Sequence, residues 1–543
     1  MGKRSPFVVA LALATCGSGL LNLYSLIHPG ISSRLAVLQR AFPLELVAAS
    51  RLVTLLLGFA LVIASLNIYR RKRRAFQAVL GLSALSLVFH LTKGVDYEAA
   101  FLSFVLLVLL YWRRREFTVR SGLPDAWSAA THVGVALVVS LAYGVAGFWL
   151  LDRREFGIDF TLGDSVRQTV RQLALLGTPA LVPHTRHAAW FLDSFPLVTA
   201  GVVLYTVGSF FRPVLYRVRT APREREAATA LAHQHGRSSM DFFKLWPDKS
   251  LYFSASRQAF LAYSGAGGLA LVLGDPVGPD TEIEPLVRDF ADFCDGNDWR
   301  CAFYQTLPDY LPQYERCGFA TLKLGEDAIV GLDRFTLDGK EKKSLRDGIR
   351  RIERQGIQAR RYEPPLSDAL LAELRHVSDD WLHIPGRRER QFTLGRFLPD
   401  YVRSCPVMVA VAPDGTVQAF ANVIPSYRKG ETTIDLMRRR ADSPNGVMDY
   451  LLVKLFQSSR EQGFERFSLG LAPMSGFMPD ERASPEERAI HSFFQHLTFI
   501  FSFTGLRAYK AKFATEWEPR YIVYRHALDL PRVGLTLARV SEI

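Results

Sequence analysis

A strand-like segment in the last third of the chain carries an acid and three consecutive arginines. The segment TIDLMRRRADSPNG (433–446) follows the apolar run AFANVIP (419–425) and precedes the helix-like run YLLVKLF (450–456). An acid and an arginine at a buried strand cost free energy unless they are paired or take part in chemistry. Asp435 and Arg438 are therefore the first candidates for a functional site, with a structural ion pair between them as the alternative.

A basic segment indicates a phosphate-rich partner. The stretch DGKEKKSLRDGIRRIERQGIQARR (338–361) carries nine basic residues against four acids, and its apolar residues fall on one helical face. This excess favours RNA or anionic membrane over a merely solvated helix, and the net charge of +13 points the same way. The cationic surface of this helix would include Arg350, Arg351 and Arg354.

Two further basic clusters follow. The stretch GRRERQFTLGRF (386–397) interleaves arginines, Arg396 among them, with aromatic residues, and LRAYKAKFATEWEPRY (506–521) contains Lys510 and Lys512. These lysines are two residues apart, so on a strand they would share one face. Such a pair could hold a phosphate or a 3′-terminal adenosine.

Several signatures are missing from the sequence. There is no GxSxG elbow, Walker A loop, HExxH or GxGxxG, and no Gly-rich pyrophosphate loop like that of acetyl-CoA-dependent acetyltransferases. The five cysteines form no CxxC pair, which argues against zinc sites and a disulfide framework. We therefore expect no cofactor and no metal, and an acyl or aminoacyl donor that no nucleotide cofactor delivers.

The first 215 residues hold long apolar runs. Arginine-rich loops follow the second, fourth and sixth of these runs, so the positive-inside rule places those loops and both termini in the cytoplasm. We expect a multi-pass protein of the bacterial cytoplasmic (inner) membrane. The six runs approach the roughly 20 residues that a membrane helix needs, and they lie at about 7–27, 44–68, 76–92, 98–112, 129–151 and 189–211.

The remainder reads as a soluble α/β protein in which strands and helices alternate. Residues 250–279 read as strand, turn, strand. Later elements are expected as helices at 338–356, 367–382 and 446–462, and as strands at 407–412, 417–424, 431–438 and 465–470. The expected domains are a transmembrane domain (1–215), a linker (216–237) and a cytoplasmic domain (238–543) with two subdomains, 238–330 and 331–543.

Eight stretches between about 269 and 522 occur in an order that one known family shares. They are LALVLGDPVGP, KEKKSLRDGIRRIERQG, SDDWL, GRRERQFTLGRF, AFANVIP, TIDLMRRRADSPNGVMDYLLVKLF, RFSLGLAPMSG and YKAKFATEWEPRY. With them the soluble part resembles the synthase domain of the multiple peptide resistance factor (MprF) family, the aminoacyl-phosphatidylglycerol synthases. The six apolar runs resemble the membrane part that precedes this domain in the family.

The resemblance implies tandem acetyltransferase-like (GNAT) subdomains with a tunnel between them. It also implies transfer of an amino acid, lysine or alanine first, from aminoacyl-tRNA to phosphatidylglycerol. The product would lower the negative charge of the membrane and aid resistance to cationic peptides. Many family members carry further N-terminal spans that form a flippase. We expect this chain not to contain them, so a separate lipid flippase is an expected partner.

The resemblance also assigns candidate site residues. In the family motif an acid and an arginine three residues later are associated with catalysis, and here these are Asp435 and Arg438. Asp435 could take the proton of the lipid hydroxyl, and Arg438 could hold the lipid phosphate. Lys510 and Lys512 could bind phosphate or stabilise the developing oxyanion. Substrate contacts are expected from Arg350, Arg351, Arg354, Arg396, Asn445, Asp449, Glu518 and Arg520.

Three alternatives stay open. The acceptor could be another lipid such as diacylglycerol, or the enzyme could be of the Fem type that adds amino acids to peptidoglycan precursors. The chain could also be a catalytically silent membrane module that binds RNA or lipid. The sequence identifies neither the amino acid nor the oligomeric state.

Overall fold

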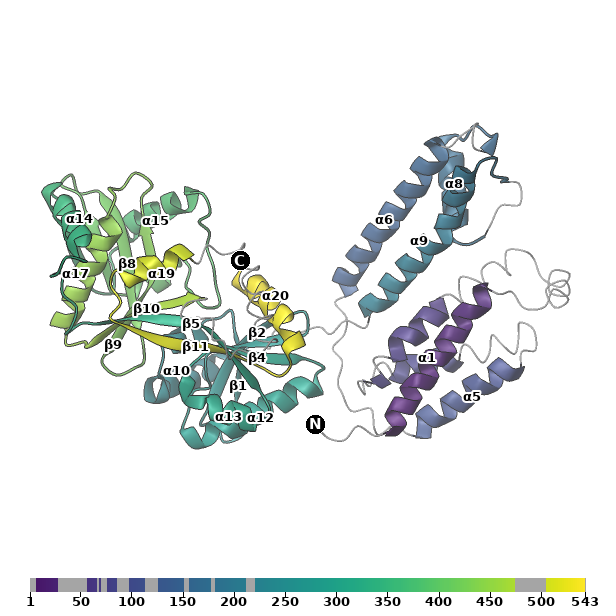
Figure 1. The fold of residues 1–543 in the computed structure, drawn as a ribbon, viewed down its shortest axis with the longest axis horizontal. Helices are drawn as coiled ribbons and strands as arrows, with labels where there is room; N and C mark the ends of the chain where they lie inside the picture. Colours follow the sequence, from purple (N-terminus) through teal and green to yellow (C-terminus); the bar gives the residue numbers. More distant parts are fainter. Residues whose placement is uncertain are drawn as a thin grey trace. The chain divides into compact units, whose positions relative to one another are not determined.

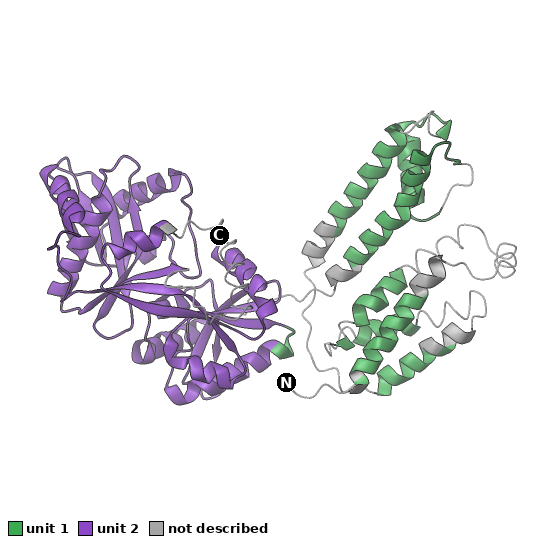
Figure 2. Ribbon diagram, viewed as in Figure 1, with its two compact units in different colours: residues 1–214, 295–298 green, residues 215–294, 299–543 purple. Residues whose placement is uncertain are grey.

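The computed structural model divides into two compact units, residues 1–214 with 295–298 and residues 215–294 with 299–543 (Figure 2). The first unit is helical and the second is α/β, and each has hydrophobic clusters of its own. The residues that the structure describes are 6–27, 56–65, 68–69, 76–84, 97–112, 126–150, 156–176, 181–210, 220–473 and 504–542.

The first unit is built of helices, several of them long (Figure 1), and the sequences of the long ones are mostly apolar. Two stretches, Val133–Leu150 and Arg186–Thr206, are long and apolar enough to cross a bilayer. The helices are α1 (Pro6–Ile27), α5 (Tyr97–Trp112), α6 (Ala126–Leu150), α8 (Leu162–Leu173) and α9 (Arg186–Phe210), with further helical residues at 56–65, 68–69 and 76–84.

The structure therefore supports a helical domain with two candidate spans, and the number six stays a prediction. α1 and α5 coincide with the first and fourth predicted spans, and α6 and α9 coincide with the last two. Residues 44–55 and 85–92, which belong to the second and third predicted spans, lie outside the described residues.

α6 and α9 approach closely because a glycine of α6 lies at their contact. A Cβ at Gly147 would collide with the ring of Phe191. Phe148 packs against Phe191 and Phe195, with ring centroids 5.1 and 5.8 Å apart. These aromatic rings form the centre of the cluster that joins α6 to α9.

The second unit is built on one sheet of eleven strands (Figure 1). The strand order is β1-β2-β3-β4-β11-β5-β10-β9-β8-β7-β6. The strands are β1 (Ser250–Phe253), β2 (Phe260–Ala266), β3 (Leu269–Leu273), β4 (Arg300–Thr306), β5 (Ala320–Gly331), β6 (Gln358–Tyr362), β7 (Val407–Val411), β8 (Val417–Pro425), β9 (Glu431–Arg439), β10 (Arg466–Pro473) and β11 (Glu516–Tyr524).

Helices pack on this sheet in separate clusters. α14 and α17 share one core with β7, β8 and β10, while α12 shares another with β2, β3 and β4. The helices are α10 (Pro222–His235), α11 (Met240–Lys244), α12 (Asp280–Gly296), α13 (Leu311–Arg316), α14 (Lys343–Arg354), α15 (Asp368–His383), α16 (Pro399–Arg403), α17 (Val447–Glu461), α19 (Thr504–Ala511) and α20 (Leu530–Ser541), with 3-10 turns η2 (Pro308–Tyr310) and η4 (Ala527–Asp529).

The sheet contains the same pattern twice. β1, β2 and β3 are antiparallel, and β3 then pairs in parallel with β4 after the crossover helix α12. β7, β8 and β9 are likewise antiparallel, and β9 pairs in parallel with β10 after α17. This repetition agrees with the tandem α/β arrangement expected from the sequence.

The C-terminal strand β11 lies in the sheet between the two copies of this pattern. β11 lies between β4 and β5 and is antiparallel to both. α20 then packs on β3, so the chain end returns to the half that begins at residue 250. That half is therefore built from both predicted subdomains.

Residues 250–279 differ from the prediction because they hold three strands instead of two. Gly267 and Gly268 form a two-residue turn between β2 and β3, with φ of 61° and 79°. Glycine adopts positive φ without strain, and two-residue hairpin turns require such values. The GAGG stretch is thus a hairpin tip. The other predicted helices and strands are present with ends shifted by a few residues, most at α14, which begins at Lys343.

Candidate functional site

The candidate site lies where β9 and β10 stop pairing. Their parallel register covers only three residue pairs and ends at Ser468↔Thr433. Just beyond this point β9 has a bulge, since Asp435 and Leu436 together oppose the single residue Asn422 of β8. Bulges of this kind redirect side chains, and here the redirected residue is the predicted acid.

β10 has an irregularity at the same level. Its register with β5 shifts between Ser468 and Leu471, and Gly470 has a φ of 75°. The Leu471 carbonyl accepts a hydrogen bond from the Lys510 ammonium at 2.8 Å. Asp435 on β9 and Lys510 against β10 thus flank the point where the two strands diverge.

Two donors hold the Asp435 carboxylate. The Tyr401 hydroxyl donates to Oδ2 at 2.6 Å, and the Gly395 N–H donates to Oδ1 at 2.8 Å. A Cβ at Gly395 would collide with this carboxylate, so the contact requires glycine. The Asn422 amide donates to the Tyr401 oxygen at 2.8 Å, which fixes the hydroxyl in turn.

Burial raises the pKa of Asp435 to about 6, although the hydrogen bonds from Tyr401 and Gly395 and the charge of Arg438 oppose the rise. Burial and the neighbouring carboxylate hold the pKa of the Tyr401 hydroxyl well above its usual value, so it remains a donor. A fixed carboxylate with a pKa near neutrality is suited to accept a proton.

Arg438 does not pair with Asp435. Its buried guanidinium forms two parallel contacts with the Glu389 carboxylate, at 2.8 and 2.7 Å, and lies 4.8 Å from the centre of the Trp381 ring. The alternative of a structural ion pair between Asp435 and Arg438 is therefore wrong, because the guanidinium binds Glu389 instead. The predicted role of Arg438 toward the lipid phosphate stays a prediction. The ion pair between Arg438 and Glu389 holds residues 386–398, called the strap below, against β9.

We expect Arg438→Lys to loosen the strap. An ammonium can form neither the two parallel contacts to Glu389 nor the stacking on Trp381. A half-buried carboxylate left poorly paired costs on the order of 2 kcal/mol of unfolding free energy. The measurement is the thermal unfolding midpoint, combined with limited proteolysis inside the strap.

Arg439→Lys is the matched control for this experiment. Arg439 donates to the Arg440 and Ala441 carbonyls and to the Ser443 hydroxyl, and no carboxylate of the described residues pairs with it. An unchanged midpoint with lost activity in Arg438→Lys would instead make Arg438 a substrate contact.

The two lysines do not share a face, contrary to the strand prediction. Lys510 lies in the last turn of α19 and Lys512 follows the helix, so their side chains diverge. Lys512 reaches Asp449 on α17, with 3.0 Å between Nζ and Oδ2, and is half exposed. Lys510 is partly buried, and burial lowers its pKa to about 8 against the opposing charge of Asp327.

Glu518 and Arg520 lie on β11 within a chain of ion pairs. Arg520 contacts Asp327 through Nε at 2.8 Å, and both side chains are almost fully buried. Glu518 accepts from Arg428 at 2.9 Å and also pairs with Arg466. Burial raises the pKa of Glu518, but these two arginines outweigh it and lower the pKa below its usual value. Among the described residues, Asp327 Oδ1 and Arg520 Nη1 have no hydrogen-bond partner.

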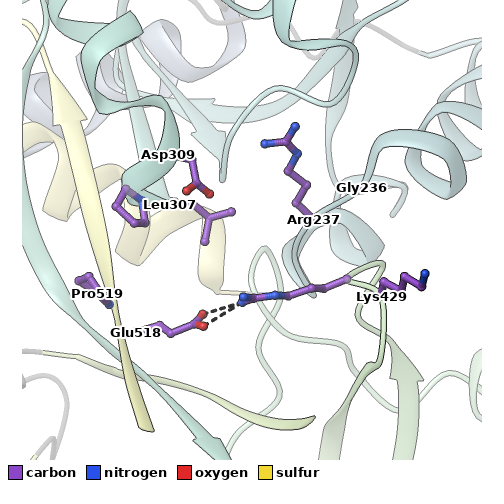
Figure 3. A pocket seen from close by; sticks show the side chains of 9 residues that line it. Gly236, Arg237, Leu307, Asp309, Lys429, Glu518 and Pro519 are labelled. Carbon is purple, nitrogen blue, oxygen red and sulfur yellow. Dashed lines mark hydrogen bonds and ion pairs between the residues drawn. The ribbon is translucent and has the colours of Figure 1, made fainter. Parts of the chain in front are cut away.

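A pocket of about 350 Å³ opens beside Glu518 (Figure 3). The paired contacts of Arg428 with Glu518, drawn as dashed lines there, form part of its wall. Lys429, next to Arg428, and Arg237 from another segment add cations, and Asp309 adds an acid. This mixture of charges suits a polar group better than an acyl chain.

The remaining predicted substrate residues are dispersed over the α/β unit. The structure records no contact between any of them and Asp435 within the residues it describes. Nor do those residues contain a cluster of three or more His, Cys, Asp and Glu side chains that could hold a metal ion. Arg350, Arg351 and Arg354 are exposed on α14, Arg396 is half-buried in the strap, Asn445 is exposed before α17, and Asp449 binds Lys512.

Sequence reasoning missed the residues that fix the acid and the arginine. Gly395 and Glu389 lie in the strap, Asn422 lies in β8, and Tyr401 lies in α16. The lone glutamate among the strap arginines was a possible signal, because a carboxylate there suggests a partner arginine. The order of residues does not show that the strap folds back onto β9.

The comparisons with known proteins agree with the resemblance. Residues 229–524 match the family model described as phosphatidylglycerol lysyltransferase, C-terminal. The chain is 29% identical over 521 residues to the phosphatidylglycerol lysyltransferase of Bacillus subtilis (strain 168), which covers 95% of this chain and 57% of that protein. For the protein of that name from Staphylococcus haemolyticus (strain JCSC1435), identity is 30% over 354 residues, covering 65% and 41%. The chain thus spans about half the length of these curated relatives.

The α/β unit is also similar to two solved structures. L-PGS from Bacillus licheniformis is 33% identical, with a TM-score of 0.53. The C-terminal domain of a putative lysylphosphatidylglycerol synthetase from Agrobacterium fabrum is 36% identical, with a TM-score of 0.53. Each comparison covers 59% of this chain and 97% of the solved chain. They confirm the predicted α/β domain.

Proposed function

Because the chain belongs to the phosphatidylglycerol lysyltransferase (MprF) family, we propose that it is a membrane-bound aminoacyltransferase. It moves an amino acid from aminoacyl-tRNA to a hydroxyl of phosphatidylglycerol at the cytoplasmic face of the bacterial inner membrane. The observation that carries the proposal is the partly buried Asp435 carboxylate, held by Tyr401 and Gly395 within the family-matched domain. Lysine is the first candidate amino acid, since the relatives are named lysyltransferases.

The reaction exchanges one ester for another. The lipid hydroxyl oxygen bonds to the aminoacyl carbonyl carbon, and the bond from that carbon to the terminal ribose oxygen of the tRNA breaks. Asp435 takes the hydroxyl proton as the new bond forms, and the proton passes to the departing ribose oxygen. The Lys510 ammonium stabilises the oxyanion that forms in between. An aminoacyl ester is already activated, so no covalent enzyme intermediate is needed.

The helical unit presents the lipid acceptor in this proposal. Large apolar side chains lie exposed on α6, among them Val135, Val138, Val139 and Trp149, and such a surface suits hydrocarbon. We place six spans at the ranges predicted from the sequence, with the arginine-rich loops and both termini in the cytoplasm. The added amino acid then lowers the net negative charge of the membrane and weakens the binding of cationic peptides.

The function is tested by expressing the full chain in a host that makes phosphatidylglycerol but no aminoacyl lipid. Mass spectrometry of the extracted lipids reports the amino acid and the acceptor together. In isolated membranes, product formation should need aminoacyl-tRNA and should not need acetyl-CoA. Product that still forms after ribonuclease treatment would overturn the proposal. Aminoacylated diacylglycerol or peptidoglycan precursor would identify a different acceptor.

We expect the arginines of α14 to contribute to tRNA binding. The helix buries Leu345, Ile349 and Ile352 and exposes basic side chains on its other faces. Changing Arg350, Arg351 and Arg354 together to Gln should raise the KM for aminoacyl-tRNA and flatten its dependence on salt, because fewer counterions are released on binding. The measurement is KM across a series of ionic strengths.

The control variant changes Arg257, Arg288 and Arg316 to Gln. These arginines are equally exposed, but each already pairs with a glutamate of the chain. A salt dependence that is the same in both triple variants and in the unchanged protein would mean that α14 does not face the tRNA.

A further inference from the structure

The α/β unit exposes few large hydrophobic side chains. Within residues 220–473 and 504–542 they are Leu394, Leu506, Leu528 and Leu535. Leu528 is 88% exposed and Leu535 is 59% exposed, which are the largest values among them. A single exposed leucine needs no explanation, but two of these four lie on the strap and on α19, the segments that carry Gly395 and Lys510.

Two of these leucines lie at the C-terminal helix. Arg532, Leu535 and Arg539 follow one another at steps of three and four residues, which places them on one face of α20, and Leu528 lies in the turn η4 just before this helix. The opposite side of α20 buries Leu530, Val533 and Val540 in the core that contains β3. The outer face of α20 therefore alternates leucine with arginine.

The strap connects α20 to the candidate site. The Gln391 N–H donates to the Ser541 carbonyl at 3.1 Å, and the Gln391 side-chain amide donates to the Glu542 carbonyl at 2.8 Å. Four residues further on, the Gly395 N–H donates to Asp435. The exposed Leu394 is the direct neighbour of this glycine, so it lies on the segment that touches the acid.

The fourth leucine lies on the other side of the same site. Leu506 belongs to α19, the helix that carries Lys510. Its neighbour Arg507 is exposed and stacks over the Trp517 ring at 4.6 Å. Each exposed leucine thus has an arginine within three or four residues. Leu394 belongs to the strap that holds Asp435 and Leu506 to the helix that carries Lys510, while Leu528 and Leu535 belong to the C-terminal segment that the strap contacts.

We propose that Leu394, Leu506, Leu528 and Leu535, with Arg532 and Arg539, form a membrane-contact face that rests on an anionic lipid surface. Leucine side chains gain free energy at the boundary of headgroups and acyl chains, while arginines bind lipid phosphates. α20 lies in the plane of the interface in this arrangement. The proposal rests on the proposed function for the presence of lipid at the site, and it adds how the α/β unit meets that lipid.

This face has a consequence for the acceptor lipid. Because the strap runs from α20 to Asp435, contact of α20 with the bilayer brings the acid close to the headgroup layer. A lipid hydroxyl can then reach the carboxylate while the acyl chains stay in the bilayer. Complete extraction of the lipid, which would expose two acyl chains to water, is avoided.

The direct test measures membrane depth in the full chain in lipid nanodiscs. An environment-sensitive fluorescent amino acid is placed by codon suppression at Leu394, Leu506, Leu528 or Leu535, and at the exposed Gln358 of β6 as a control. Nanodiscs contain phosphatidylglycerol or neutral lipid only, with a nitroxide on the acyl chains as quencher. We expect quenching and a blue shift at the four leucine positions with phosphatidylglycerol, and neither at Gln358.

Other outcomes overturn the proposal. Equal quenching at Gln358 and Leu535, or none at the four leucine positions, would show that this face does not meet the bilayer. A blue shift that persists in detergent and grows with protein concentration would assign the face to a second copy of the chain.

An activity test separates this proposal from the proposed function. Leu528→Asp with Leu535→Asp should raise the KM for phosphatidylglycerol in nanodiscs by about tenfold. The same variant should use a monomeric, short-chain phosphatidylglycerol as well as the unchanged protein does. If the unchanged protein uses neither acceptor, the proposed function fails. If it uses both and the variant loses both equally, only the membrane-contact face fails.

Discussion

Asp435→Asn should lower the rate of aminoacyl transfer by about 10²–10⁴-fold, the range typical of a general base. Asparagine keeps the volume of the side chain and can still accept from the Tyr401 hydroxyl. It cannot take a proton, and its amide loses one of the two fixed contacts of the carboxylate. The measurement is the initial rate at saturating aminoacyl-tRNA and lipid, with the unfolding midpoint measured in parallel.

Asp442→Asn is the matched control, since Asp442 is an exposed acid of the same segment that pairs with the Arg440 side chain. We expect its rate to stay close to that of the unchanged protein. If Asp435→Asn unfolds and its folded fraction keeps the full rate, Asp435 is a structural acid and not the base.

The pH profile gives independent evidence on Asp435. A base must be deprotonated, so the rate should fall as the pH drops through about 6, the pKa that burial gives this carboxylate. Tyr401→Phe removes a donor that lowers this pKa. The acid side of the profile should therefore move to higher pH, which a merely structural tyrosine would not cause.

Lys510→Met should lower the transfer rate by about 10²–10³-fold, as expected for the loss of one oxyanion donor. Methionine fills a similar volume without a charge. Burial lowers the pKa of Lys510 to about 8, so the ammonium is largely present at pH 7. The rate of the unchanged protein should accordingly fall as the pH rises through about 8. Lys510→Met should lose this basic side of the profile.

Two other lysines provide comparisons for the Lys510→Met variant. Lys454→Met is the control, because Lys454 of α17 pairs with Glu353 of α14. Lys512→Met should cost far less than Lys510→Met, since Lys512 is half exposed and bound to Asp449. A larger loss in Lys512→Met than in Lys510→Met would reverse the assignment and return the predicted role to Lys512.

The sequence was sufficient for the properties that depend on local pattern. Alternation of apolar runs and turn residues predicts most strands and helices of the α/β unit, because periodicity follows from the pitch of each element. α14 illustrates this, since the spacing of Leu345, Ile349 and Ile352 already implies a buried face opposite the arginines. The ordered motifs between 269 and 522 were specific enough to indicate the family.

Contacts between distant segments could not be predicted in this way. Arg438 pairs with Glu389 and Lys510 with the Leu471 carbonyl, across 49 and 39 positions of the chain. No local rule selects such partners, because they depend on which strands are neighbours in the sheet. The error on Lys510 and Lys512 has the same origin, since two lysines two apart share a face only on a strand.

The sequence by itself determined that an acid lies at the exit of a buried strand, beside basic surfaces suited to RNA and anionic lipid. Only the tertiary structure decided that Tyr401 and Gly395 hold the Asp435 carboxylate and that Arg438 pairs with Glu389. The physical reason is that residue type fixes charge and hydropathy. A pKa near neutrality needs burial and fixed donors, and these come from segments that meet only when the sheet has formed.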